Sequence, residues 1–269
     1  MKLAKEHRLL AFGAALAVGA CSSSSSSTPA AASDASAQAP DASGGKLDSP
    51  ATLRQFESGA EAMSEGPRGV LPGHVPDWAA AQAAYDADFA LWQTGVPDAG
   101  IPPLRPTLVA AGVPTATLTA IDAALAAYKV DLMQQDQRAA ENDGNKITKT
   151  VPDAFDYFTY SAPSDTLRLD GTFRQLQIDA EYSDWAACAN DLRDTQAVWA
   201  NLKSKVAAKA PSRPDITGSA TVVADVDATL QAAQALIADD GGMATDVASL
   251  EVQAQKGLDE TDTCEQVFK

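Results

Sequence analysis

The sequence predicts an all-α fold, a tandem duplicated helical bundle with two units of about four helices each. Alanine-rich segments with apolar residues at steps of three and four are typical of packed helices. Runs dense in Val, Ile, Tyr and Thr, which would mark strands, are nearly absent. The four tryptophans form two pairs, Trp78 with Trp92 and Trp185 with Trp199, and the first tryptophan of each pair belongs to an Asp-Trp-Ala-Ala run.

Residues 1–20 have the pattern of a signal peptide. Lys2, Lys5 and Arg8 give a basic start, and the apolar run 9–17 is too short for a permanent membrane span. Small residues then lead to a cysteine at position 21. The alternative is an ordinary secretory leader with a cysteine there by chance.

The run Val18-Gly19-Ala20-Cys21 resembles the lipobox of bacterial lipoproteins. The resemblance implies cleavage before Cys21 and lipidation of that residue. Several acyl chains would then anchor the protein in the membrane, which is its expected partner. Ser22 follows Cys21 where many inner-membrane lipoproteins have Asp, which favours the outer membrane, on the periplasmic side or the cell surface.

Residues 21–48 are rich in Ser, Ala, Pro and Asp and have almost no large apolar side chains. Such a segment cannot bury enough surface to offset its ordering entropy. We therefore expect a disordered tether between the lipid and the folded body.

Helical unit 1 is expected over 49–161. A short amphipathic helix should begin near Pro50 and end at Gly66-Pro67, and Asp77 should cap the helix that carries the first tryptophan pair. A linker over 95–106 precedes a third helix that starts after Pro114. The run Asn142-Asp143-Gly144 either separates the third and fourth helices or kinks one long helix.

Helical unit 2 is expected over 162–269 in the same order. Ser164 should cap its first helix, and Ser183 or Asp184 the tryptophan helix. A linker over 210–218 leads to the third helix, and Gly241-Gly242 should end that helix before the fourth.

Short matches between the units support duplication over convergence of alanine-rich helices. The run Asp122-Ala-Ala-Leu125 matches Asp227-Ala-Thr-Leu230, and Leu53-Arg54-Gln55-Phe56 matches Phe173-Arg174-Gln175-Leu176. The copies could be two bundles in tandem or halves of one larger bundle. The tryptophans have ordinary core spacing in either case; a ligand cage is the alternative.

The chain is strongly acidic. Without residues 1–20 it keeps 17 basic and 35 acidic residues, a net charge of −18. Such a surface repels nucleic acid, so nucleic acid is excluded as a partner, while cations or basic partners are tolerated.

If Cys21 is lipidated, Cys188 and Cys264 remain as a pair in an oxidising compartment. We expect a disulfide between them, which would stabilise the fold by ~4 kcal/mol in the chain-entropy model. The alternative is two buried free thiols.

No motif supports catalysis, so the protein is expected to be no enzyme and to need no cofactor. The run 222–229 is similar to the first motif of haloacid dehalogenase phosphatases, but no strand and helix alternation follows it. His74 is the only histidine outside the leader, too few for a zinc site or a catalytic triad.

The duplicated, lipid-anchored helical layout is similar to that of imelysin-like proteins, paired helical bundles linked to iron uptake. Their Gly-x-His-x-x-Glu motif is absent here, so the resemblance assigns no site residues. The leading hypothesis is a non-enzymatic, lipid-anchored cell-envelope protein that binds a protein or small ligand. The alternative is a periplasmic metal or metallophore binder that uses carboxylates such as Asp86, Asp88, Asp122 and Asp227.

Overall fold

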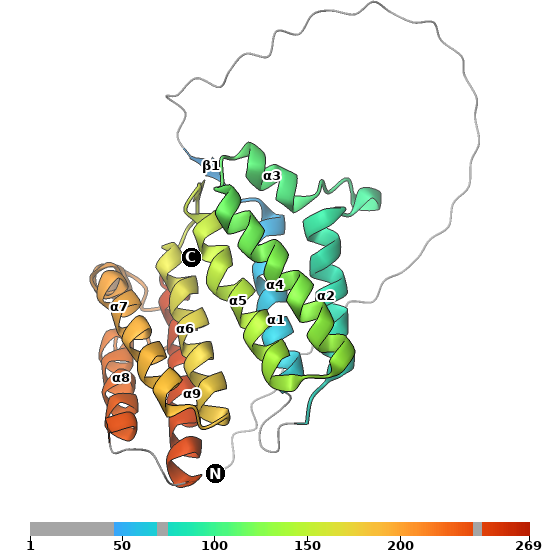
Figure 1. Cartoon of the computed structure of the whole chain (residues 1–269). Helices are drawn as coiled ribbons and strands as arrows, with labels where there is room; N and C mark the ends of the chain where they lie inside the picture. The colour runs from blue at the N-terminus through green and yellow to red at the C-terminus, as the bar shows by residue number, and fades with distance from the viewer. Residues whose placement is uncertain (1–45, 69–74, 239–243) are drawn as a thin grey trace, which may run out of the picture. The chain divides into compact units, whose positions relative to one another are not determined.

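The computed structural model describes residues 46–68, 75–238 and 244–269, and this part of the chain is all-α, as predicted (Figure 1). The first bundle contains α1 (Ala51–Arg68), α2 (Trp78–Gln93), α4 (Thr115–Gln134) and α5 (Gln137–Phe155). The second contains α6 (Ser164–Glu181), α7 (Trp185–Lys209), α8 (Val222–Ala238) and α9 (Ala244–Gln266). The expected leader, Cys21, His74 and the Gly241-Gly242 stop lie outside the described residues.

Smaller elements connect these helices. They are α3 (Leu104–Ala110), the 3₁₀ turns η1 (Pro97–Ala99) and η2 (Ala210–Ser212), and the two-residue strands β1 (Leu47–Asp48) and β2 (Phe158–Thr159). Strand β1 pairs in parallel with β2, and the Ser49 N–H donates to the carbonyl oxygen of Thr159 at 3.0 Å. Leu47 and Asp48, which the sequence analysis placed in the tether, are therefore ordered, because their backbone pairs with β2.

Both bundles pack their helices in the same order. In each, the first helix contacts the second and fourth, and the third contacts the second and fourth. The buried apolar residues form two separate clusters, one from Leu53 to Leu167 and one from Leu169 to Val267. Trp78 and Trp185 are both half-buried and each packs against the core of its own bundle. The eight long helices of the described residues therefore form two four-helix groups, which also pack on each other through α5 and α6.

The tryptophan helices begin with the predicted caps. Asp77 accepts a hydrogen bond from the N–H of Ala80 at 2.9 Å, and Asp184 accepts one from the N–H of Ala187 at 3.2 Å. Each carboxylate satisfies a helix N–H that has no partner within the helix. Ser164 does not cap α6 through its side chain, because its hydroxyl donates to Asp156.

Three of the four helix starts repeat at a constant interval. Trp78 and Trp185, Thr115 and Val222, and Gln137 and Ala244 are each 107 positions apart. The first helices, α1 and α6, both have 18 residues and begin 113 positions apart, at Ala51 and Ser164. This register pairs Phe56 with Leu169, so the sequence match of Leu53 with Phe173 is shifted by two helical turns. Duplication remains a prediction, and these intervals are consistent with it.

Three boundaries in the first bundle differ from the prediction. Helix α1 continues through Gly66 and Pro67 to Arg68, and α3 lies in the region expected to be linker. The break between the third and fourth helices falls at Gln135, which has a left-handed φ of 53°, and Asp136 caps α5. Gly144 lies inside α5, where a Cβ atom would be 2.8 Å from the backbone nitrogen of Ser64 on α1. That glycine allows a close helix contact and does not end a helix.

The contact between the bundles is made largely by α5 and α6 and is polar. The buried amide of Asn145 on α5 donates to the Gly171 carbonyl at 3.0 Å and to the Gln175 side chain at 2.9 Å, both on α6. Gln175 in turn donates to Asp179 at 3.0 Å. Among the described helices, none is long and apolar enough to cross a membrane.

Candidate binding groove between α7 and α8

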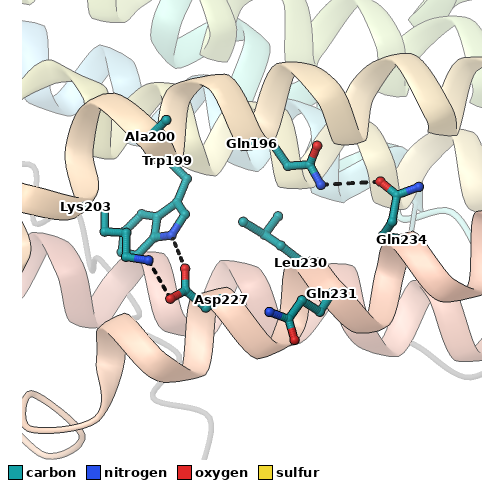
Figure 2. Close-up of a pocket in the computed structure, with 8 residues that line it drawn as sticks. All are labelled: Gln196, Trp199, Ala200, Lys203, Asp227, Leu230, Gln231 and Gln234. Atoms are coloured by element: carbon teal, nitrogen blue, oxygen red, sulfur yellow. Dashed lines mark hydrogen bonds and ion pairs between the residues drawn. The ribbon is translucent and has the colours of Figure 1, made fainter.

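A groove of about 400 Å³ lies between α7 and α8 of the second bundle (Figure 2). Two helices packed side by side leave such a channel where the residues facing each other are small or splay apart. The lining residues are Gln196, Trp199, Ala200 and Lys203 on α7, and Asp227, Leu230, Gln231 and Gln234 on α8.

The floor of the groove is apolar. Trp199 and Leu230 belong to the seams that pack α7 and α8 into the core, and they are 4% and 5% exposed. Ala200, one residue after Trp199, is exposed and has only a methyl group, so no bulky side chain covers the groove beside the indole. The floor can therefore accept an apolar group without moving the helices.

One end of the groove is closed by a three-residue network. The indole Nε1 of Trp199 donates to Oδ1 of Asp227 at 2.9 Å, and Nζ of Lys203 lies 2.7 Å from Oδ2 of the same carboxylate. Partial burial alone would raise the pKa of Asp227, but the bonds from Lys203 and Trp199 outweigh it and lower that pKa below its usual value. The carboxylate is thus ionised and its charge is matched inside the protein.

The rim of the groove carries three amides. The Gln196 side chain donates to that of Gln234 across the groove at a long 3.4 Å, and the side-chain amide of the exposed Gln231 has no hydrogen-bond partner among the described residues. A glutamine amide offers both donor and acceptor atoms. The groove can therefore hydrogen-bond an uncharged polar ligand over an apolar floor.

The first bundle repeats the tryptophan contact with a different cation. Trp92 donates to Asp122 at 2.7 Å, and the guanidinium of Arg105 holds both oxygens of that carboxylate, with its nearest nitrogen at 2.8 Å. Arg105 comes from α3, whereas Lys203 comes from the part of α7 that continues past its tryptophan. Both halves use one indole, one carboxylate and one cation.

The structure does not bring together the four carboxylates considered for a metal. Asp86 is exposed and accepts from Gln82, Asp88 is buried on another face of α2, and Asp122 and Asp227 lie in different bundles. Within the described residues no group of three His, Cys, Asp or Glu side chains could hold a metal ion.

The expected disulfide between Cys188 and Cys264 is not present; both are buried free thiols. Cys188 lies in the first turn of α7, beside the end of α6, whereas Cys264 lies near the end of α9. Helices α6 and α9 are antiparallel, because Phe173 meets Gly257 and Gln177 meets Gln255. Cys264 is thus level with the start of α6, ~18 Å along the axis from Cys188 at 1.5 Å per residue. A disulfide needs Cα atoms within about 7 Å.

Residues 222–229, which are similar to a phosphatase motif, form the start of α8, and Asp227 is used by the Trp199 network. The groove glutamines were not singled out from the sequence. Their signal was weak: Gln231 and Gln234 are three residues apart beside the α8 seam, an arrangement that also describes an ordinary solvated face.

Comparison of the chain with protein-family models, with curated proteins and with solved structures finds no match.

Proposed function

We propose that the protein is a lipid-anchored cell-envelope protein with a non-enzymatic binding role, and that the groove between α7 and α8 binds a short, uncharged, extended peptide segment. The observation that carries this proposal is the combination of an apolar floor with three glutamine amides on the rim. A glutamine amide has the same donor and acceptor groups as a peptide bond, so it can pair with a peptide backbone through both.

The length of the groove supports a segment of about three residues. Gln196 marks one end and Lys203 the other, seven residues apart on α7. Seven helical residues span ~10 Å, and an extended chain advances ~3.3 Å per residue. One apolar side chain of such a segment would lie over Trp199 and Leu230.

The charges in the groove support an uncharged ligand. Asp227 and Lys203 neutralise each other at 2.7 Å, so a charged ligand would have to replace that contact. Apart from Asp227 and Lys203, which are paired with each other, the lining residues contain no group that could act as a nucleophile or a base. This composition supports binding without chemistry.

Binding can be tested with the probe N-acetyl-Ala-Leu-Ala-amide and its acidic analogue N-acetyl-Asp-Leu-Asp-amide. We expect the neutral probe to shift the NMR signals of the groove glutamines and the Trp199 indole, and the acidic probe to bind at least tenfold more weakly. Gln231→Ala with Gln234→Ala should reduce the neutral probe's affinity. Gln82→Ala, an exposed glutamine of the first bundle, is the matched control. Equal shifts with both probes, or none with either, would count against the proposal.

The anchor has its own test. Processing at Cys21 predicts that the mature protein in the producing bacterium carries acyl chains on that residue and sediments with membranes. Cys21→Ala should move the protein to the soluble fraction, because the several acyl chains expected on Cys21 provide the membrane affinity. An unacylated Cys21 in the wild-type protein, read by mass spectrometry, would remove this part of the proposal.

A further inference from the structure

A cluster of acidic side chains surrounds one buried arginine where the two bundles meet. Arg174 on α6 is 6% exposed and binds Asp170, one turn earlier, with two nitrogens at 3.1 and 3.3 Å. It also binds Glu65 of α1 at 2.7 Å, so a salt bridge links the first bundle to the second. Glu57 and Glu61, on the same face of α1, hydrogen-bond to each other and interact electrostatically with Asp170 and Arg174.

Helix α9 and the segment between the bundles complete the cluster. Glu265 accepts a hydrogen bond from the hydroxyl of Tyr160 at 2.6 Å, and it interacts electrostatically with Glu57. Asp262, one turn earlier on α9, interacts with Asp170 and Glu265. Arg54, at the start of α1, interacts electrostatically with Tyr160. Five carboxyl groups from α1, α6 and α9 thus interact with Arg174. The sixth, Glu265, interacts with Asp170 and forms a salt bridge with Lys269 at 2.8 Å.

We propose that this cluster is a proton-controlled joint: α1 stays against α6 and α9 while its carboxyl groups hold protons, and the two bundles separate there when these groups ionise. We call Glu57, Glu61, Glu65, Asp170, Arg174, Asp262 and Glu265 the joint.

The packing of the two bundles makes a joint possible. Their apolar cores are separate clusters, except that Leu167 at the start of α6 packs in the first core, so opening at the joint exposes little apolar surface. Contacts between α5 and α6 include polar ones that water can replace, such as those of Asn145 with Gly171 and Gln175. At the far end of α1, Nε of Arg68 lies 3.4 Å from Oε2 of Glu181 on α6. Glu141 and Glu251 also interact electrostatically with Arg68.

The charge balance sets the direction of the response. If all six carboxyl groups were ionised, six negative charges would face two cations, Arg174 and the Lys269 that binds Glu265 at 2.8 Å. Burial raises the pKa of Glu57 to about 7 and that of Asp262 to about 6, and it raises the pKa of Glu61 well above its usual value. The neutral forms therefore persist at mildly acidic pH, and charge accumulates at the joint between about pH 6 and pH 8.

Small-angle scattering and far-UV circular dichroism, measured together from pH 5 to pH 9, test the proposal. The protein is the chain with Cys21→Ala, which carries no lipid. We expect the radius of gyration to increase with pH while the helical signal stays constant. Glu57→Gln with Glu61→Gln, which mimics the protonated pair, should abolish the increase. Asp86→Asn with Asp98→Asn removes two exposed charges of the first bundle and should retain it.

Asp262→Asn provides a second, single-site variant, in case the double glutamine variant does not fold. With one negative charge fewer at the joint, the midpoint of the expansion should shift to higher pH. The proposal is overturned if the wild-type dimensions are constant over this range, if expansion coincides with loss of helical signal, or if Asp262→Asn leaves the midpoint unchanged.

Discussion

A Cβ atom placed on Gly59 of α1 would lie 2.0 Å from Oδ1 of Asp88 on α2. The two helices therefore meet through a bare backbone on one side and a carboxyl group on the other. Asp88 is 2% exposed, its Oδ2 has no hydrogen-bond partner, and burial, with a smaller contribution from Glu57, raises its pKa to about 9. The side chain is held neutral at the helix contact.

Gly59→Ala should therefore destabilise the fold, although alanine is the better helix former. The added methyl group must displace Asp88 from a packed site, at a cost of about 1–3 kcal/mol that exceeds the gain of up to about 1 kcal/mol in helix propensity. Urea unfolding followed by circular dichroism gives the change. Ser58→Ala, at the exposed neighbouring position, should change stability by less than about 0.5 kcal/mol. Adding Asp88→Ala to Gly59→Ala should recover part of the loss, and no recovery would refute the steric explanation.

Stability should fall as the pH rises from 5.5 to 8.5. Burial raises the pKa of Asp88 to about 9 and, with the neighbouring Asp179, that of Asp191 to about 8, so the folded state holds protons that the unfolded chain has released. The contribution of such groups is fully present below the ordinary carboxyl pKa near 4 and is lost as the pH rises toward the folded value. Each unit of difference corresponds to about 1.4 kcal/mol.

Urea midpoints measured across that range test this pH dependence. Asp88→Asn and Asp191→Asn replace the titrating groups with neutral ones of the same shape, so each should flatten the decline. Asp98→Asn, at an exposed position, should leave the slope unchanged. A wild-type midpoint that is constant or rises with pH would contradict the prediction.

The indole–carboxylate hydrogen bonds should contribute similar amounts to the free energy of unfolding in the two bundles. Asp122→Ala and Asp227→Ala each leave an indole N–H without its acceptor at Trp92 or Trp199, and we expect a loss of about 1–3 kcal/mol in each case. Asp194→Ala, an exposed carboxylate on α7, should cost less than about 0.5 kcal/mol. Losses in the control as large as in the pair variants would show that the tryptophan contact is not responsible.

Cys188 and Cys264 should both be reduced and unreactive in the folded protein. Each is buried, and burial raises the pKa of each thiol to about 12, so little thiolate forms at neutral pH. In the Cys21→Ala chain, Ellman's reagent should detect two thiols after denaturation and almost none before it. A reducing agent should leave the thermal midpoint unchanged. A covalent link between the peptides that contain Cys188 and Cys264 would contradict the structure.

The helices with strong local signals were predictable. Asp77 and Asp184 predict the starts of their helices, because an aspartate before an apolar periodic run accepts hydrogen bonds from the free N–H groups of the first turn. Tertiary contacts decided the rest. Gly144 is a helix breaker by propensity but is needed for the close contact of α5 with α1, and α3 is only seven residues long, too short for a periodic pattern.

The candidate site was less predictable than the fold. Asp227 was considered as a metal ligand, and nothing in its local sequence shows that Trp199, 28 positions earlier, donates to it. Glu57, Glu61 and Arg174 read as ordinary polar positions of amphipathic helices until α1 and α6 are placed side by side. Cysteine pairing inferred from number and compartment failed because it ignored the up-and-down course of the helices, which puts the two residues at opposite ends of the bundle.

The separate cores also give the molecule two independent optical probes. Trp78 and Trp92 pack only in the first core, and Trp185 and Trp199 only in the second. Replacing either pair with phenylalanine leaves a chain whose fluorescence reports a single bundle. The melting of one bundle can then be followed while the other is still intact, so that the energetic dependence of each half on its neighbour is measured within one polypeptide.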